Sequence, residues 1–354
     1  MKALGDILEY EQPTKYIVSS ENYNDSYATP VLTAGQTFIL GYTNETEGIY
    51  SKPLPVVIFD DFTTAVKFVN FPFKVKSSAM KILKAANKDV HIPYWYYYLT
   101  SVHIDNDLHK RYWISTFANM QVNIPSLKVQ RQIAARLDKA QELIALQKEQ
   151  IKKADELIKS RFIEMFGDPI SNPKKFVQKT IDKVSEMLFA GGDREQDISP
   201  TEKGEYVYPV YSNGETNNGL LGYSKKYRVA KQALTISARG TIGFLVIREP
   251  CFTPVVRLIT LIPQNYMNIV YLKYMLNCIK FVSSGTSQGQ LTIPNFKKIK
   301  VIIPSLSLQN KFADFVAEAE KQKKLLNNRL SMLETLYKSL MQEYFGEYDY
   351  FTRY

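Results

Sequence analysis

Few residues in this sequence have the types and spacing that catalysis needs. Asp60 and Asp61 are adjacent carboxylates, but neighbouring residues of a strand point to opposite faces, so we expect no shared acid–base or metal site. His91, His103 and His109 have no cysteine nearby and no counterpart elsewhere in the chain, and we interpret them as surface or structural residues. The sequence therefore predicts neither a catalytic residue nor a metal site.

Motifs that bind cofactors are also missing. The sequence contains no G-x-x-x-x-G-K-[ST] phosphate loop, no G-x-G-x-x-G after a strand, no H-E-x-x-H and no C-x-x-C. The tetrapeptide NFPF at Asn70 lacks the two central prolines of the NPPY-like motif that a methyltransferase would need. No cofactor is predicted, and we expect a binding protein more than an enzyme.

The charge of the chain suggests a polyanionic partner. The net charge is +10, and it is uneven: residues 1–123 hold 11 basic and 12 acidic side chains, whereas residues 178–300 hold 16 basic and 9 acidic ones. Ordinary solvation by lysine is the alternative explanation. The second region is therefore the better candidate for contact with a polyanion.

Length and composition indicate a soluble protein of more than one domain. A chain of 354 residues, 45% of them hydrophobic, can form two or three domains with cores of their own. Cys251 and Cys278 cannot form a disulfide framework, and the start MKALGDILEY has no signal-peptide core. No apolar run approaches the roughly 20 residues of a membrane helix. We expect a cytoplasmic protein without a membrane partner.

Two long segments repeat each other without a gap. Ile124 to Asp168 and Ile303 to Glu347 both begin with IPSL, and Pro125 and Pro304 are separated by 179 residues, as are Gly167 and Gly346. The same offset links Ser126/Ser305, Leu127/Leu306, Gln130/Gln309, Lys159/Lys338, Ser160/Ser339, Glu164/Glu343 and Phe166/Phe345. The chain is therefore predicted to run globule, helix, globule, helix.

Both segments carry apolar residues at alternating spacings of four and three, which is typical of a coiled-coil seam. Each seam would stay half exposed on its own, and an intervening globule allows the two helices to pack antiparallel. A generic packing helix is the alternative. The predicted coiled-coil interface consists of Ile133, Leu137, Ile144, Ile151, Ile158, Phe312, Val316, Leu326, Leu330, Leu333 and Tyr337.

Each globule shows short β-branched runs between turn residues, which predict strands. These runs are Pro55 to Phe59, Ala65 to Phe71, Ala233 to Ser237, Gly243 to Ile247 and Val255 to Ile262. YWYYYL, Tyr94 to Leu99, and VYLKYML, Val270 to Leu276, predict one helix each, and we expect their aromatic rings to form core and not to stack on bases.

The predicted fold class is α+β, with two repeated mixed α/β domains, each followed by a long helix, and the two helices forming an antiparallel coiled coil with pseudo-two-fold symmetry. The expected boundaries are a first domain at 1–123, its helix at 124–166, a linker at 167–177, a second domain at 178–303, its helix at 304–346 and a tail at 347–354.

Two variable globules, each followed by a near-duplicate helix opened by IPSL and a glutamine, resemble the specificity subunit of a type I restriction-modification system. The resemblance includes LGDIL at Leu4 to Leu8 and its weaker counterpart TIDKV at Thr180 to Val184. The most family-like stretches are ISARGTIG, Ile236 to Gly243, and GTSQGQLTIPNFKKIKVIIPSL, Gly285 to Leu306.

That resemblance implies a non-catalytic subunit that recognises a bipartite, asymmetric site on double-stranded DNA. Each globule would be a target recognition domain for one half-site, and the helix pair would fix their separation. Two methyltransferase subunits would bind alongside, with restriction or translocase subunits where these are present. The alternatives are a fragment of a fused restriction-modification enzyme with methyltransferase or nuclease activity, and a coiled-coil scaffold without nucleic-acid contact.

Base recognition in the major groove uses paired donors and acceptors: Arg for guanine, Asn or Gln for adenine, and Asp or Glu for cytosine. In the second globule the candidates for base contact are Ser212, Asn213, Arg239, Thr241, Gln288 and Gln290, with Lys225, Lys226 and Lys231 on phosphates. The first globule departs from the motifs, with Asp60-Asp61-Phe62-Thr63 opposite Ala238-Arg239-Gly240-Thr241. Its weaker candidates are Asn44, Lys52, Asp61, Thr63 and Lys67.

Overall fold

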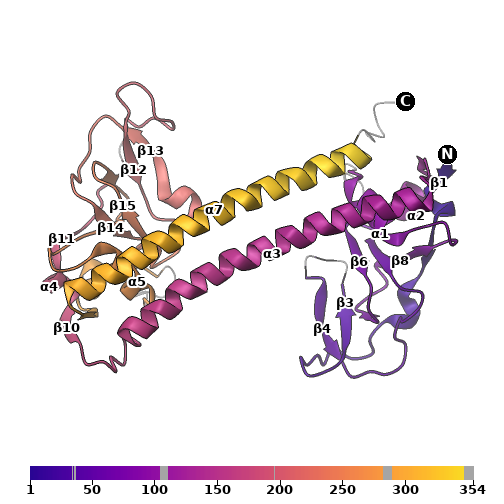
Figure 1. Cartoon of the computed structure of the whole chain (residues 1–354), viewed down its shortest axis with the longest axis horizontal. Coiled ribbons are helices and arrows are strands. Elements are labelled where there is room, and N and C mark those ends of the chain that lie inside the picture. The colour runs from indigo at the N-terminus through magenta and orange to yellow at the C-terminus, as the bar shows by residue number, and fades with distance from the viewer. Residues whose placement is uncertain (34, 36, 104–110, 195, 282–288, 347–354) are drawn as a thin grey trace. The chain divides into compact units, whose positions relative to one another are not determined.

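The computed structural model describes residues 1–33, 35, 37–103, 111–194, 196–281 and 289–346. The chain divides into two compact units: unit 1 is Met1–Lys148 with Arg329–Tyr354, and unit 2 is Glu149–Asn328. Each unit holds one globule and one part of each long helix (Figure 1). Across the described residues, none of the helices combines the length and apolar character needed to span a membrane.

The globule of unit 1 contains three small sheets. A four-stranded antiparallel sheet has the order β2 (Leu8–Glu11), β8 (Met80–Ala85), β5 (Val56–Asp60), β6 (Val66–Val69). A three-stranded sheet has the order β4 (Ile39–Thr43), β3 (Thr29–Leu32), β7 (Lys74–Val75), and β1 (Lys2–Ala3) pairs with β9 (Gln121–Val122). The helices are α1 (Ile92–Ser101) and α2 (Tyr112–Ser115), with 3-10 turns η1 (Leu4–Asp6), η2 (Pro13–Tyr16) and η3 (Phe117–Asn119).

The globule of unit 2 repeats this topology strand for strand. Its four-stranded sheet has the order β11 (Ser185–Ala190), β17 (Ile259–Pro263), β14 (Ala233–Ile236), β15 (Leu245–Arg248). Its other sheets are β13 (Leu220–Ser224), β12 (Tyr208–Tyr211), β16 (Thr253–Pro254), and the pair β10 (Val177–Thr180) and β18 (Lys300–Ile303). The helices are α4 (Ile181–Val184), α5 (Ile269–Asn277) and α6 (Ile293–Lys297), with η4 (Thr216–Gly219).

One predicted strand begins later than expected. The run from Val255 to Ile262 looked continuous because its residues are β-branched or apolar, but β17 starts at Ile259. Val256 and Arg257 instead adopt positive φ values of 53° and 64°, which no strand contains. Residues before Ile259 therefore form a turn at the end of the sheet.

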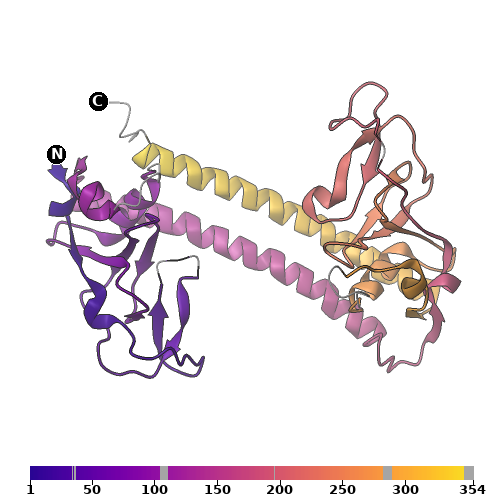
Figure 2. The same ribbon diagram turned by 180° about the vertical axis from the view of Figure 1, so that it is seen from behind.

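The long helices are α3 (Leu127–Phe166) and α7 (Leu306–Phe345), each a continuous 40 residues (Figure 2). Both begin directly after the serine of IPSL, whose backbone oxygen accepts the first helical hydrogen bond from Gln130 or Gln309, at 3.0 and 3.1 Å. After α3, Gly167 has φ +75°, and a Cβ there would lie 2.7 Å from Pro173. Glycine therefore permits the sharp exit toward the second globule.

Within unit 1 the two helices run antiparallel. Going along α3, Arg136, Gln141 and Lys148 bind successively earlier residues of α7. Arg136 donates to the Tyr344 hydroxyl at 2.8 Å, Gln141 donates to Tyr337 at 3.0 Å, and Lys148 forms an ion pair with Glu334 at 3.0 Å.

In unit 2 the two long helices also run antiparallel, but different types of residue make the contacts between them. Lys323 of α7 forms an ion pair with Asp155 of α3 at 2.6 Å, and the rings of Phe162 and Phe312 meet edge to face at 5.4 Å. The later residue of α3 again meets the earlier residue of α7. The eleven residues predicted to form the coiled-coil interface are all buried or half-buried, so the 4-3 spacing follows the observed burial.

Aromatic residues attach each globule to the helices. Trp95 and Tyr97 of α1 are almost fully buried, as is Tyr271 of α5, which confirms that these aromatic clusters are core. The Tyr94 ring lies 5.3 Å from Phe345 in unit 1, and the Tyr271 ring lies 4.8 Å from Phe166 in unit 2. The two contacts join equivalent positions of the repeat, so both globules dock in the same way.

Candidate nucleic-acid interface

The glutamine that occurs at the same position of both repeats joins each long helix to its globule. Gln130 is fully buried; its Oε1 accepts from the His91 backbone N–H at 2.9 Å, and its Nε2 donates to the carbonyls of Asp89 and Pro125 at 3.0 and 2.9 Å. Gln309 is also fully buried, and its amide oxygen and both amide hydrogens are bonded. Its partners are the Asn268 N–H at 2.8 Å and the carbonyls of Tyr266 and Pro304 at 3.2 and 2.9 Å. This joint fixes each globule, and the loops it carries, to the helix.

The hairpin loop between β14 and β15 brings two predicted residues together. Arg239 is exposed, and its guanidinium donates to the Gln290 Oε1 at 3.1 Å. The Leu291 N–H donates to the Ala238 carbonyl at 2.9 Å, which holds the chain beside Gln290 against the hairpin. Thr241 is exposed in the same loop, and Gln288 lies outside the described residues.

Two predicted base-contacting residues are bound inside the fold. Ser212 is only 8% exposed. The Asn213 amide is used at both ends, since its Nδ2 donates to the Val256 carbonyl at 2.6 Å and its Oδ1 accepts from the Ala238 N–H at 2.7 Å. We therefore withdraw both from the set of base contacts, because the Ser212 side chain is buried and because an Asn213 amide that reached a base would break both of these hydrogen bonds.

The three predicted phosphate-binding lysines differ in their surroundings. Lys225 lies 3.6 Å from both Asp197 and Glu205, and its pKa is raised chiefly by its hydrogen bond with Tyr206, then by Asp197. Lys231 forms an ion pair with Glu186. Lys226 is exposed and forms no ion pair with any described residue. Exposed ion pairs are weak, so all three lysines remain candidates for phosphate contact. Lys226 would bind a phosphate without first breaking an ion pair to a described residue.

A buried arginine missed at the sequence level stiffens the neighbouring loop. Arg248 is 5% exposed, stacks on Tyr211 at 3.8 Å, and donates to Thr235 Oγ1 at 2.9 Å and to the Asn218 carbonyl at 2.6 Å. Burial lowers the pKa of Arg248 to about 10, so it stays charged at neutral pH. The predicted strand ended at Ile247, whereas β15 includes Arg248, and only the tertiary structure shows that this side chain is buried.

In unit 1 the corresponding hairpin loop has a different construction. Asp61 is 4% exposed, accepts from the Trp113 N–H at 2.9 Å and lies 3.5 Å from the buried Lys81 ammonium. Its predicted role in base contact is withdrawn, because a buried, paired carboxylate cannot reach DNA. Thr63 is exposed, and its N–H donates to Asp60 Oδ1 at 3.0 Å.

The two hairpin loops also align one residue away from the predicted register. The Asp61 carbonyl accepts from the Tyr112 N–H at 3.0 Å, as the Ala238 carbonyl accepts from Leu291. Asp61 is therefore the counterpart of Ala238. The counterpart of Arg239 is Phe62, an aromatic residue that is 50% exposed.

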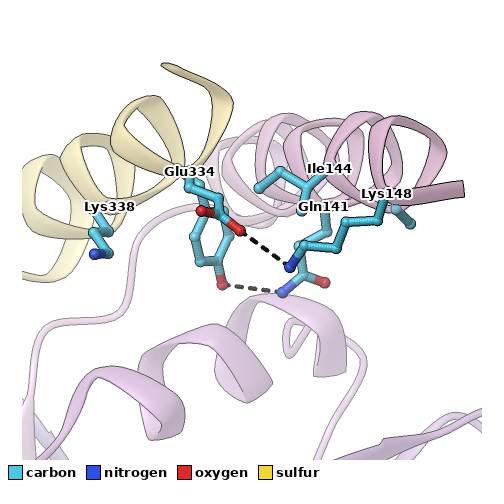
Figure 3. Close-up of a pocket in the computed structure, with 7 residues that line it drawn as sticks. Gln141, Ile144, Lys148, Glu334 and Lys338 are labelled. Carbon is cyan, nitrogen blue, oxygen red and sulfur yellow. Dashed lines mark hydrogen bonds and ion pairs between the residues drawn. The ribbon is translucent and has the colours of Figure 1, made fainter. Parts of the chain in front are cut away.

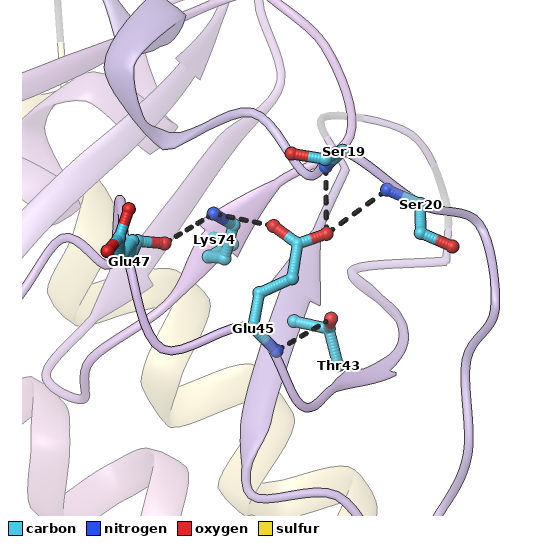
Figure 4. Close-up of polar contacts among 6 residues, drawn as sticks. All are labelled: Ser19, Ser20, Thr43, Glu45, Glu47 and Lys74. Atoms are coloured by element: carbon cyan, nitrogen blue, oxygen red, sulfur yellow. Dashed lines mark hydrogen bonds and ion pairs between the residues drawn. The ribbon is translucent and has the colours of Figure 1, made fainter.

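The remaining candidates of unit 1 differ in exposure. Asn44 and Lys52 are exposed, whereas Lys67 is half-buried with its ammonium 6.0 Å from the Phe38 ring. The loop that follows Asn44 is held by Lys74, which is 2.9 Å from Glu45 Oε2 and donates to the Glu47 carbonyl at 2.6 Å (Figure 4). The Lys74 hydrogen bond is the main cause that lowers the pKa of Glu45.

A shallow pocket lies beside the helix pair of unit 1. It is lined by Gln141, Ile144, Ala145, Lys148, Glu334, Tyr337 and Lys338 (Figure 3). The Lys148–Glu334 ion pair and the Gln141–Tyr337 hydrogen bond cross it, so four of the lining side chains are bonded to each other. Within the described part of the chain, no three His, Cys, Asp or Glu side chains form a group that could hold a metal ion.

Comparison with known proteins agrees with this architecture. The family model of the type I restriction modification DNA specificity domain matches residues 1–156 and 173–335. The EcoR124I/EcoR124II specificity subunit of Escherichia coli is 51% identical over 154 residues, which cover 40% of this chain and 38% of that protein. A Mycoplasma pneumoniae protein named as a candidate type I specificity subunit, S.MpnORF507P, is 33% identical over 201 residues, covering 55% of this chain and 54% of its own.

The fold itself has a solved counterpart. The S subunit of a type I restriction-modification system from M. genitalium superposes with a TM-score of 0.65 at 15% identity, covering 96% of this chain and 94% of that one. The chain aligns with about two-fifths to half of the length of the two curated relatives above. Because the family model matches both repeats, the chain belongs to the family of type I restriction-modification DNA specificity domains.

Proposed function

We propose that this chain is the DNA-recognition subunit of a type I restriction-modification complex, in which each globule contacts one half of a bipartite, asymmetric site. The observation that carries the proposal is the duplicated topology: two globules share one strand order and one glutamine joint but present different loops. Two different recognition surfaces on equivalent scaffolds suit two different half-sites, much as identical subunits suit a palindrome.

The second globule has the chemistry for base recognition. Arg239 is exposed beside Gln290, which gives guanidinium donors for guanine O6 and N7 and an amide for adenine N6 and N7. Lys226 supplies an unpaired cation, among the described residues, for the phosphate backbone. The first globule offers exposed Asn44, Lys52, Phe62 and Thr63, and we propose its contacts among these.

Equivalent apolar positions on the helices fit binding of two identical partners. Leu146 and Leu336 are 46% and 50% exposed in unit 1, and their repeat counterparts in unit 2, Leu325 and Leu157, are 49% and 56% exposed. Each unit thus presents the same pair of leucines. We propose that one methyltransferase subunit docks on each pair, that restriction subunits join where present, and that methylation and cleavage belong to these partners and not to this chain.

The modular role is tested by exchanging the second globule. Residues 178–300 are replaced by the matching segment of another specificity subunit, and the chain is co-expressed with its methyltransferase partner. Methylome sequencing should show one changed half-site and one unchanged half-site. A chain that supports no site-specific methylation before the exchange, or an exchange that alters both half-sites, contradicts the proposal.

Partner docking is tested separately through the leucine pairs. Leu146→Asp with Leu336→Asp should reduce the mass of the assembled complex by one methyltransferase subunit, measured by native mass spectrometry. Adding Leu157→Asp and Leu325→Asp should remove the second. Leu40→Asp, at a 40% exposed leucine of the first globule, serves as the control and should leave two subunits bound. Two bound subunits in the fourfold variant would place docking elsewhere.

A further inference from the structure

We propose that Arg257 is a second base-contacting residue of unit 2, and that Asn213 sets its position relative to Arg239. The proposal rests on the proposed function, and it names which residues of that same surface determine sequence preference. The turn at Val256 and Arg257 lies directly before β17, in a segment that was predicted as strand.

The backbone of this turn is strained. Val256 has a φ of 53° and Arg257 a φ of 64°, a left-handed conformation that is unfavourable for any residue with a Cβ and rare for a β-branched valine. Such conformations persist only where the surroundings impose them, and they concentrate at functional sites. Contacts elsewhere in the fold must therefore impose these φ values, and the turn is a candidate functional site.

The cause is a set of hydrogen bonds to a glycine pair. The N–H groups of Val256 and Arg257 donate to the carbonyls of Gly192 and Gly191, at 2.7 and 3.1 Å. A Cβ on Gly191 would lie 2.7 Å from the Pro254 carbonyl group and the Val255 nitrogen, so only glycine allows the two backbones to approach this closely. The turn is thus fixed from one side by residues 191–192.

Asn213 fixes the turn from the other side and links it to the Arg239 hairpin. Its Nδ2 donates to the carbonyl of Val256, the residue before Arg257, and its Oδ1 accepts from the N–H of Ala238, the residue before Arg239. One amide therefore spans the two positions that precede the two arginines. A single side chain therefore links the backbone beside Arg239 to the backbone beside Arg257.

Arg257 itself is free to bind a ligand. Its side chain is exposed, and no ion pair joins it to any described residue, in contrast to Lys225 and Lys231 of the same globule. A guanidinium on a rigid backbone suits the directional, bidentate bonding that guanine O6 and N7 require. A phosphate contact would need no such rigidity, since a lysine on a flexible stem provides it.

The first test measures base preference in the assembled complex. The wild-type site is determined by methylome sequencing, and a panel of duplexes with each base pair of the second half-site replaced is then tested for binding. Arg257→Ala should lose preference at one base pair, by about tenfold, and Arg239→Ala at a different one. Lys300→Ala, at an exposed cation of β18, removes the same charge and should leave preference unchanged.

The second test separates the two ends of the Asn213 amide. Asn213→Asp keeps an acceptor for the Ala238 N–H but turns a carboxylate oxygen toward the Val256 carbonyl, so preference should fall at the Arg257 base pair and persist at the Arg239 base pair. Asn213→Ala should weaken preference at both. Thermal unfolding of each variant with the wild-type transition verifies the fold.

Three results overturn the inference while leaving the proposed function intact. Arg257→Ala could retain full preference, or lose affinity equally for all sequences with a salt slope reduced by about 0.9, which identifies a phosphate contact. Asn213→Asp could affect both base pairs alike. A wild-type complex without any sequence preference instead contradicts the proposed function.

Discussion

The two globules hold equivalent hairpins in place with different residues. In both, the hairpin after β5 or β14 must be held against the sheet and against the segment that leads to the long helix. Unit 1 uses Asp61 with Lys81, both buried. By strand register, unit 2 has Ala238 and Ile259 at these positions, also buried but apolar. At these two positions unit 1 therefore places a charged pair in the core, whereas unit 2 places apolar side chains there.

A second position is also charged in unit 1 and uncharged in unit 2. Lys74 of β7 is 3% exposed and bound to Glu45, whereas its counterpart in β16 is Thr253. Lys74 and Lys81 are two of the eleven basic residues in 1–123, and neither is available to a polyanion. The first globule therefore has fewer cations available to a polyanion than its count of basic residues indicates.

The largest expected effect comes from breaking the buried pair of unit 1. Asp61→Ala leaves the Lys81 ammonium uncompensated in the core and should lower the free energy of unfolding of unit 1 by about 3 to 5 kcal/mol, measured by denaturant titration. Asp61→Ala with Lys81→Ile reproduces the arrangement of unit 2 and should recover most of that loss. A double variant as unstable as the single one would show that the pair is not the cause.

The glutamine joints should behave alike in both units, since their bonds are the same. Gln130→Ala and Gln309→Ala each leave a buried N–H and buried carbonyls without partners, at a cost of about 1 to 3 kcal/mol. Denaturation followed by amide hydrogen exchange should place the loss at residues 89–91 in the first case and at 266–268 in the second. Unequal losses of unfolding free energy would mean that other contacts also hold one of the two globules to its helix.

Acid should weaken unit 1 through Glu45. Its pKa is held below the ordinary value, so its contribution to stability is present above the unfolded pKa of about 4.5 and is lost as pH falls through the lower folded value. Unfolding free energies at pH 7 and pH 3 should therefore differ more in the wild type than in Glu45→Gln. Equal pH dependence in the two proteins would remove the Lys74–Glu45 pair as the source.

The smallest effect concerns the surface cations of unit 2. Lys226→Ala should weaken binding to every DNA sequence alike and reduce the slope of log affinity against log salt by about 0.9. Lys225→Ala should change affinity less, because that ammonium must first leave Asp197 and Glu205. Fluorescence anisotropy over a salt series measures both, and identical slopes for wild type and Lys226→Ala would exclude a phosphate contact.

Periodic features were predictable from the sequence, and single loop side chains were not. The repeat at 179 residues, the helix ends at Gly167 and Gly346 and the buried aromatic residues of α1 all follow from spacing and residue type. Asn213 and Asp61 have the right chemistry for bases but are bound to residues 43 and 52 positions away. The turn at Arg257 was predicted as strand because the surrounding residues are apolar, and the turn is imposed only by hydrogen bonds to residues distant in sequence.

The bonding of Gln130 and Gln309 has a consequence for how such proteins diversify. Every atom that these amides bind in the globule belongs to the backbone: an N–H and a carbonyl two residues earlier. The connection therefore places little demand on which side chains the globule carries. A globule exchanged together with its aromatic contacts to the helices would therefore keep this part of its attachment, whatever surface loops it carries.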